Sequence, residues 1–176
     1  MQEPRRGSGE CSVVALLFTA AGIYGLVVVA GVVGADSVGF VATVTLIGFG
    51  LALFVGGSLE RYLPASLWRR FSLSRAASRR WGVDCFNAFL WRIGWNKHIV
   101  AMRKRESDGN EKEPILRQVR ASAVGHSWSV LLHVASAIWA VTADGWLAAV
   151  VLLMIGIIGH VYPVLLQIRV MARLRE

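Results

Sequence analysis

Four long apolar runs constrain the fold of this chain more than any other feature of its sequence. None of them contains Asp, Glu, Lys or Arg, and they lie at residues 12–34, 38–57, 127–141 and 146–166. A transmembrane helix needs about 20 consecutive, mostly apolar residues, which three of the runs provide and the third run approaches. The sequence therefore predicts an all-α membrane protein. We expect a single membrane domain over residues 1–176, with four transmembrane helices arranged as two hairpins.

The basic residues predict the orientation of these helices. All 19 Lys and Arg precede the first run, lie between Arg61 and Arg120, or follow the last run. The two short turns between paired runs contain none. Because positively charged loops stay on the cytoplasmic side of a membrane, both termini and the loop of residues 58–126 are predicted to be cytoplasmic. The net charge of +8 is thus explained by topology, and nucleic acid is not an expected partner.

The loop between the hairpins is predicted to contain interfacial amphipathic helices. Residues 64–82 and 85–105 combine aromatic and aliphatic side chains with many arginines. Such segments lie in the headgroup layer of a membrane with their apolar face inward. The alternative is a solvated, positively charged collar that takes no part in a functional site. The sequence leaves both interpretations open.

Polar side chains in the last hairpin are predicted to meet at the same depth. If the hairpin turns near residues 143 and 144, residues at equal distances before and after the turn lie at the same depth in the two antiparallel helices. By this count His160 lies beside His126, and Gln167 lies at the level of Arg120. Both pairs fall near the cytoplasmic end of the hairpin.

The same polar residues also share helix faces. On the third helix they recur at intervals of three or four, which places them on one stripe: Gln118, Ser122, His126, Ser129 and His133. On the fourth helix, His160 and Gln167 share a face, and Pro163 frees one backbone carbonyl between them. Ionisable residues inside a membrane are costly and are candidates for function. We therefore predict a pocket in which His126 and His160 lie within direct or one-water hydrogen-bonding distance.

Two other interpretations of these polar residues stay open. The histidines and Gln167 could hold the hairpin together by hydrogen bonds, each worth about 1 kcal/mol in lipid. Alternatively, His126, His160 and His98 could share a metal ion. No pattern of acidic residues supports such a site, and no metal is predicted.

Small residues at intervals of four predict where helices approach each other closely. In the second apolar run these are Gly48, Ala52 and Gly56, and in the first run they are Ala21 and Gly25. Small side chains let helix backbones come together in lipid. We expect these positions to serve packing and not catalysis.

Two segments of the second half carry a recognisable motif. They read RQVRASAVGHSW, at residues 117–128, and GHVYPVLLQIRVMARL, at residues 159–174. Both resemble the glycosyl-diaponeurosporenoate acyltransferase family of bacterial carotenoid pathways, and the segment FNAFLWRIGWNKHIV is similar to the central part of that family. The residues that match the family motifs are Arg120, His126, His160, Pro163, Gln167 and Arg169. The chain departs from the family pattern where Ser122 replaces an acidic residue and where His160 replaces a common Asn.

The resemblance implies a small integral membrane acyltransferase of the bacterial inner membrane. It would move an acyl group from a thioester to a hydroxyl of a lipid-linked or glycosylated isoprenoid. A histidine suits the task of deprotonating that hydroxyl, so His126 and His160 are the candidate catalytic residues. The candidate substrate-binding residues are Arg120, Gln167, Trp95, Asn96, Lys97 and His98.

The expected partners are membrane lipids, a lipid-like acceptor and an acyl donor, for which acyl-coenzyme A is the candidate. No cofactor is expected, and the sequence leaves a homo-oligomer open. The competing interpretation is a non-catalytic scaffold, or a subunit of a larger membrane enzyme or export complex. Such a protein would not need a histidine pocket and would tolerate substitution at His126.

Overall fold

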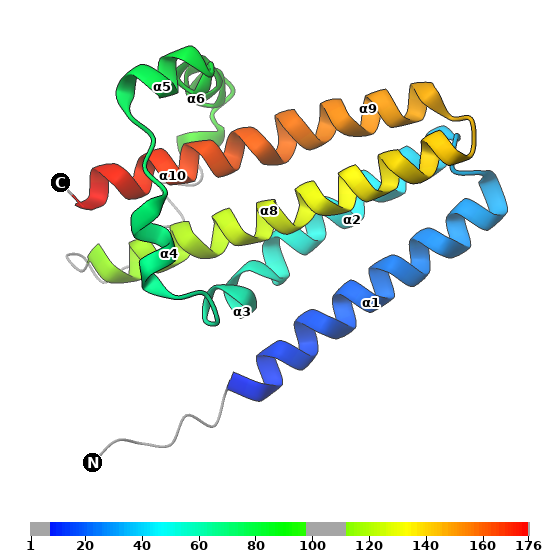
Figure 1. The fold of residues 1–176 in the computed structure, drawn as a ribbon, viewed down its shortest axis with the longest axis horizontal. Coiled ribbons are helices and arrows are strands. Elements are labelled where there is room, and N and C mark those ends of the chain that lie inside the picture. The colour runs from blue at the N-terminus through cyan, green and yellow to red at the C-terminus, as the bar shows by residue number, and fades with distance from the viewer. Residues whose placement is uncertain (1–7, 98–111, 176) are drawn as a thin grey trace.

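The first two apolar runs form two helices joined by a tight turn. The computed structural model describes residues 8–97 and 112–175, and within it α1 (Ser8–Val33) is followed by α2 (Val38–Phe54). Gly34 has a φ of +85°, a conformation that glycine adopts without strain, and ends α1. The Ser37 hydroxyl accepts a hydrogen bond from the Phe40 N–H at 3.0 Å and caps α2. Toward its N-terminus, α1 diverges from the other helices (Figure 1).

Four short helices with described bounds follow α2 within residues 56–92. They are α3 (Gly56–Glu60), α4 (Ala65–Arg70), α5 (Arg75–Arg80) and α6 (Val83–Arg92). In Figure 1, α5 and α6 lie together beside the C-terminal helix, at the end of the molecule that carries the C-terminus. The predicted helical character of this loop is confirmed for these segments.

The last two apolar runs form the longest helices of the structure. α8 (Lys112–Thr142) is followed by one helical path made of α9 (Trp146–Gly156), a π-helical turn η1 (Ile157–Val161) and α10 (Tyr162–Arg175). The turn between them includes Asp144 at a φ of 58° and lies where the sequence predicts it. α8 begins 15 residues before the predicted span of residues 127–141, so the final part of the predicted loop is helical.

The π-helical turn lies next to Pro163. Proline has no backbone N–H, so the regular helical hydrogen bond to the carbonyl of Gly159, four residues earlier, is not made. One residue before the proline, the N–H of Tyr162 bonds the carbonyl of Ile157, five residues back. This π turn contains His160, and such turns occur often at functional sites.

The contacts of α2 and α3 with α8 depend on glycine. A Cβ atom added to Gly56, the first residue of α3, would clash with the Ala121 carbonyl of α8, and one added to Gly125 of α8 would clash with the Ala52 carbonyl of α2. No side chain fits at either position, so the two backbones cross in direct contact. The predicted packing role is thus confirmed for Gly56 and Ala52. The prediction does not hold for Gly25, because no neighbouring atom lies within 4 Å of a Cβ added there.

Three helical stretches within the described residues are long and apolar enough to cross a membrane. They cover Ala15–Val33, Glu113–Thr142 and Trp146–Arg175. α2 is equally apolar, but it has 17 residues and is shorter than a typical span. The described residues are helical or irregular, and none forms a β-strand. The all-α class predicted for this part of the chain is therefore confirmed.

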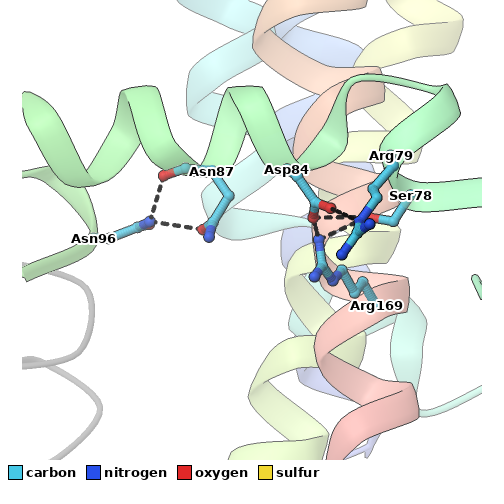
Figure 2. A network of polar contacts seen from close by, with 6 residues as sticks. All are labelled: Ser78, Arg79, Asp84, Asn87, Asn96 and Arg169. Atoms are coloured by element: carbon cyan, nitrogen blue, oxygen red, sulfur yellow. Dashed lines mark hydrogen bonds and ion pairs between the residues drawn. The ribbon is translucent and has the colours of Figure 1, made fainter. Parts of the chain in front are cut away.

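A polar network fastens α5 and α6 to α10. The Arg169 guanidinium of α10 donates a hydrogen bond to the Ser78 hydroxyl at 2.7 Å and forms an ion pair with Asp84 (Figure 2). Nearby, the rings of Phe86 and Tyr162 lie 5.1 Å apart. These contacts leave the outer faces of α5 and α6 exposed, with Trp81 and other aromatic side chains accessible.

Candidate functional site

His126 and His160 form a hydrogen-bonded pair across the interface between α8 and η1. Their Nδ1 atoms are 3.0 Å apart, which confirms the predicted contact. His160 is completely buried and His126 is half-buried. Because a hydrogen bond between two Nδ1 atoms needs one donor and one acceptor, the neutral rings must hold opposite tautomers.

Gln167 and Ser122 make a second contact between α8 and α10, one helical turn from the histidine pair. The Gln167 amide donates a hydrogen bond to the Ser122 hydroxyl at 3.2 Å. Ser122 precedes His126 by four residues and therefore lies on the same face of α8. The sequence predicts that Gln167 lies at the level of Arg120 on α8. In the structure it contacts Ser122, two residues further along that helix.

A third histidine extends the site into the bundle. His133 is completely buried, and its Nδ1 donates a hydrogen bond to the Ser129 carbonyl at 2.9 Å. The Ser129 hydroxyl in turn donates to the Gly48 carbonyl of α2 at 2.6 Å. The ring centroids of His133 and His160 are 4.8 Å apart. The three imidazoles therefore form a continuous column between α2, α8 and η1.

Gly48 makes room for the two deeper imidazoles. A Cβ atom on Gly48 would lie 2.5 Å from Cε1 of His133 and 3.4 Å from Nε2 of His160. On the other side, a Cβ on Gly156 would lie 3.0 Å from Cβ of His133. Two glycines from different helices thus border the histidine column.

Two nitrogen atoms of the column are buried without a hydrogen-bond partner among the described residues. They are Nε2 of His133 and Nε2 of His160. Because the Nδ1 of His133 is bound to hydrogen, its Nε2 presents a lone pair when the ring is neutral. Buried polar atoms are nearly always paired, and exceptions occur at catalytic sites.

The structure does not bring Arg120 to the histidine pair. α8 is continuous through residue 120, and six residues at 100° each turn Arg120 about 120° away from His126. Its side chain is 16% exposed and forms an ion pair with Glu113 on the same helix at 3.5 Å. Its Nε is buried without a partner among the described residues.

The candidate binding residues before the second hairpin lie beyond the end of α6. Asn96 donates hydrogen bonds to the side-chain and backbone oxygens of Asn87, at 2.9 and 3.3 Å (Figure 2). Trp95 and Lys97 are exposed. No described contact joins these three residues to the histidine pair. His98, the fourth candidate, lies outside the described residues.

An apolar groove on α8 is separate from this site. Its volume is about 310 Å³, and it is lined by α1, α2 and α8, with Trp128 and Leu131 among the lining residues. By helical spacing, these two side chains lie on the side of α8 away from His126. Within the described residues, no group of three or more His, Cys, Asp or Glu could hold a metal ion.

The sequence model of the glycosyl-4,4'-diaponeurosporenoate acyltransferase family matches residues 64–176. This match covers well over half of the chain and contains the histidine pair, Ser122 and Gln167. The chain belongs to this family. The first two helices lie outside the matched region. Neither the curated proteins nor the solved structures contain a significant match to the chain.

Sequence reasoning missed three parts of the site of this acyltransferase family member. The polar stripe of the third helix includes Ser122, but the sequence does not predict that Ser122 is the partner of Gln167. The contact of Gly48 with the histidines was read as helix packing alone. The role of Arg169 in fastening α5 and α6 was also missed, although its place in the family motif marks it as a residue to examine.

Proposed function

We propose that the chain is an integral membrane acyltransferase. It would move an acyl group from a thioester donor to a hydroxyl of a lipid-linked or glycosylated isoprenoid acceptor. The observation that carries this proposal is the His126–His160 hydrogen bond of 3.0 Å within the region matched by the family. Membership of the family supports the reaction class, and the identities of donor and acceptor are part of the proposal.

In the proposed mechanism, His126 is the general base and His160 is a positioning residue. His126 is the more exposed ring of the pair, so a substrate hydroxyl reaches it more easily. If its Nδ1–H donates to the Nδ1 of His160, its Nε2 carries the lone pair that a base needs. His160 then holds the reactive tautomer and orientation of His126.

Acyl transfer proceeds through a tetrahedral intermediate, with His126 first accepting a proton and then returning it. Nε2 of His126 takes the proton of the acceptor hydroxyl while the oxygen attacks the thioester carbonyl carbon. The C–O bond forms, the negative charge passes to the carbonyl oxygen, and the tetrahedral intermediate collapses. The C–S bond then breaks, and the leaving thiolate receives the proton from His126. General-base catalysis of this type contributes about 10²- to 10⁴-fold to a rate.

The residues around the pair would stabilise and bind the reactants. The Ser122 hydroxyl accepts a hydrogen bond from Gln167, so its own hydrogen is directed elsewhere and can reach an oxyanion. Gln167 fixes that orientation. Arg120, Trp95, Asn96, Lys97 and His98 remain candidates for binding the donor and the acceptor, with acyl-coenzyme A as the proposed donor.

Variants of the pair test this function. His126→Gln should lower formation of acylated glycolipid by about 10²- to 10⁴-fold in purified protein supplied with acyl-coenzyme A. His160→Ala should lower it too, whereas His160→Asn should retain much of it, because an Asn carbonyl can accept the His126 N–H. Full activity of a well-folded His126→Gln variant would refute the mechanism. A wild-type protein inactive with every donor would support the scaffold interpretation.

We further propose that four spans cross a bacterial inner membrane with both termini in the cytoplasm. The distribution of all 19 basic residues supports this orientation. Single cysteines at Asp36 and Ala143, which are exposed in the two turns, should react with an impermeant thiol reagent added to intact cells. Cys85 is exposed and should react only after permeabilisation. Labelling of Cys85 in intact cells would contradict the orientation.

A further inference from the structure

Four arginines gather where α5 meets α10. Arg169 is the least exposed of them, with 14% of its side chain accessible, and it is held by Ser78 and Asp84 (Figure 2). Arg79 lies 4.0 Å from the Asp84 carboxylate that pairs with Arg169. Arg75 is one helical turn from Arg79 on α5, and Arg173 is one turn from Arg169 on α10. The positive charges of all three repel that of Arg169. The cluster thus joins two arginines of α5 to two of α10.

The charges in this cluster are not balanced by the described residues. Among the described residues, Asp84 is the one carboxylate that pairs with any of the four, and its contact with Arg79 is long, at 4.0 Å. Like charges at short distance destabilise a fold unless a counter-charge lies between them. Arg75, Arg79 and Arg173 are all exposed, so a ligand can reach their guanidinium groups.

We propose that Arg75, Arg79 and Arg173, grouped around the Arg169–Asp84 pair, form a binding site for a phosphate group. The guanidinium fork matches the oxygen atoms of a phosphate and binds two of them at once. A phosphate held by arginines of both α5 and α10 neutralises their repulsion. It also strengthens the attachment of α5 and α6 to the bundle.

The surroundings favour the headgroup of an anionic phospholipid as the source of this phosphate. Arg169 and Arg173 are four residues apart and share one face of α10, whereas Gln167 lies two residues from Arg169 and points to the opposite side. The cluster is therefore separate from the histidine pair. Trp81 is 64% exposed on the adjoining end of α5, and tryptophan is typical of the headgroup layer. Basic pockets beside membrane helices bind such headgroups.

Lipid binding to the purified protein tests the site independently of any acyl-transfer activity. The measurement is native mass spectrometry in detergent with phosphatidylglycerol, with phosphatidylcholine, or with inorganic pyrophosphate as the soluble phosphate. We expect saturable binding of phosphatidylglycerol and weaker binding of phosphatidylcholine, whose choline cation the arginines repel. Replacing Arg75, Arg79 and Arg173 together by Gln should weaken binding by about 10²-fold, at about fivefold per basic residue.

A matched control removes the same charge elsewhere. The control is a triple variant that alters three other exposed arginines, Arg61→Gln, Arg70→Gln and Arg92→Gln. Both triple variants leave the Arg169–Asp84 pair intact. This control should bind phosphatidylglycerol like the wild type. Equal weakening in both variants, or no saturable binding of any probe, would overturn the proposal. Saturation by pyrophosphate but not by phosphatidylglycerol would keep the phosphate site and assign it to a soluble ligand.

Discussion

Replacing Gly48 by alanine should damage the histidine column, because no space exists for the added methyl group. A Cβ at this position would lie 2.5 Å from Cε1 and 3.2 Å from Nδ1 of His133, and 3.4 Å from Nε2 of His160. His133 resists displacement, because its Nδ1–H is bonded to the Ser129 carbonyl at 2.9 Å. The rings and α2 must therefore move apart.

The cost of Gly48→Ala follows from two opposing terms. Overpacking a filled site typically destabilises a fold by about 1–3 kcal/mol. Alanine in place of glycine favours the helix by about 1 kcal/mol, so the net loss of stability should be about 0–2 kcal/mol. If His160 shifts relative to His126 by about 1 Å, acyl transfer should fall by about 10²-fold.

Gly50→Ala provides the matched control on the same helix. No atom lies within 4 Å of a Cβ at Gly50, so this substitution should be neutral or slightly stabilising. Thermal unfolding in detergent and the rate of acyl transfer, measured for both variants, test the reasoning. Gly48→Ala with the unfolding temperature and activity of Gly50→Ala would refute it, and would show that the column has more free space than the structure indicates.

Two further predictions concern how the bundle is held together. Gly56→Ala and Gly125→Ala should each abolish folding or sharply lower the yield of monodisperse protein. In both variants the new Cβ meets the backbone of a neighbouring helix, which cannot rotate away as a side chain can. A normal yield and a normal unfolding temperature would contradict this prediction. Asp84→Asn should loosen the attachment of α5 and α6 to α10, because it removes the negative charge that pairs with the little-exposed Arg169. Limited proteolysis within residues 71–97 should then become faster, while the long helices stay intact. An unchanged cleavage pattern would show that the Phe86–Tyr162 contact suffices.

The depth of the polar groups in the last two helices could be predicted from sequence, because it depends only on the position of the turn between them. Two antiparallel helices rise by the same distance per residue, so the position of the turn fixes which residues face each other. The observed pairs, His126 with His160 and Ser122 with Gln167, lie within two residues of the expected levels. For two regular helices, no further information is needed to predict which residues lie at the same level.

The placement of Arg120 could not be predicted in the same way, because it depends on where α8 begins. A helix starting after residue 120 would free the side chain to turn toward the histidines. The structure continues the helix back to Lys112, so the helical rotation directs Arg120 elsewhere. The start of a helix is set by weak local preferences and by tertiary packing, and here α3 and α4 pack beside that part of the chain.

The contacts that complete the site join distant parts of the sequence. Ser129 and Gly48 are 81 residues apart, and Arg169 and Ser78 are 91 residues apart. Periodicity describes each helix separately and does not give the rotation of one helix against another. The spacing of small residues predicts that Gly48 is a packing position, but its neighbours are two imidazoles, which no pattern within α2 could show.

The column has structural features that a hairpin joined only by hydrogen bonds would not need. Gly48 and Gly156 both lie inside helices, where glycine costs about 1 kcal/mol relative to alanine, and both border His133. Two imidazole nitrogens also remain buried without partners among the described residues. We interpret these costs as the consequence of holding an imidazole behind His126, where it orients the reactive ring. Acyl transfer by His160→Asn and His160→Ala tests this, because Asn keeps an acceptor for the His126 N–H and should retain much of the activity, whereas Ala removes the acceptor and should not. Equal acyl transfer by the wild type and His160→Ala would leave the pair with a structural role alone.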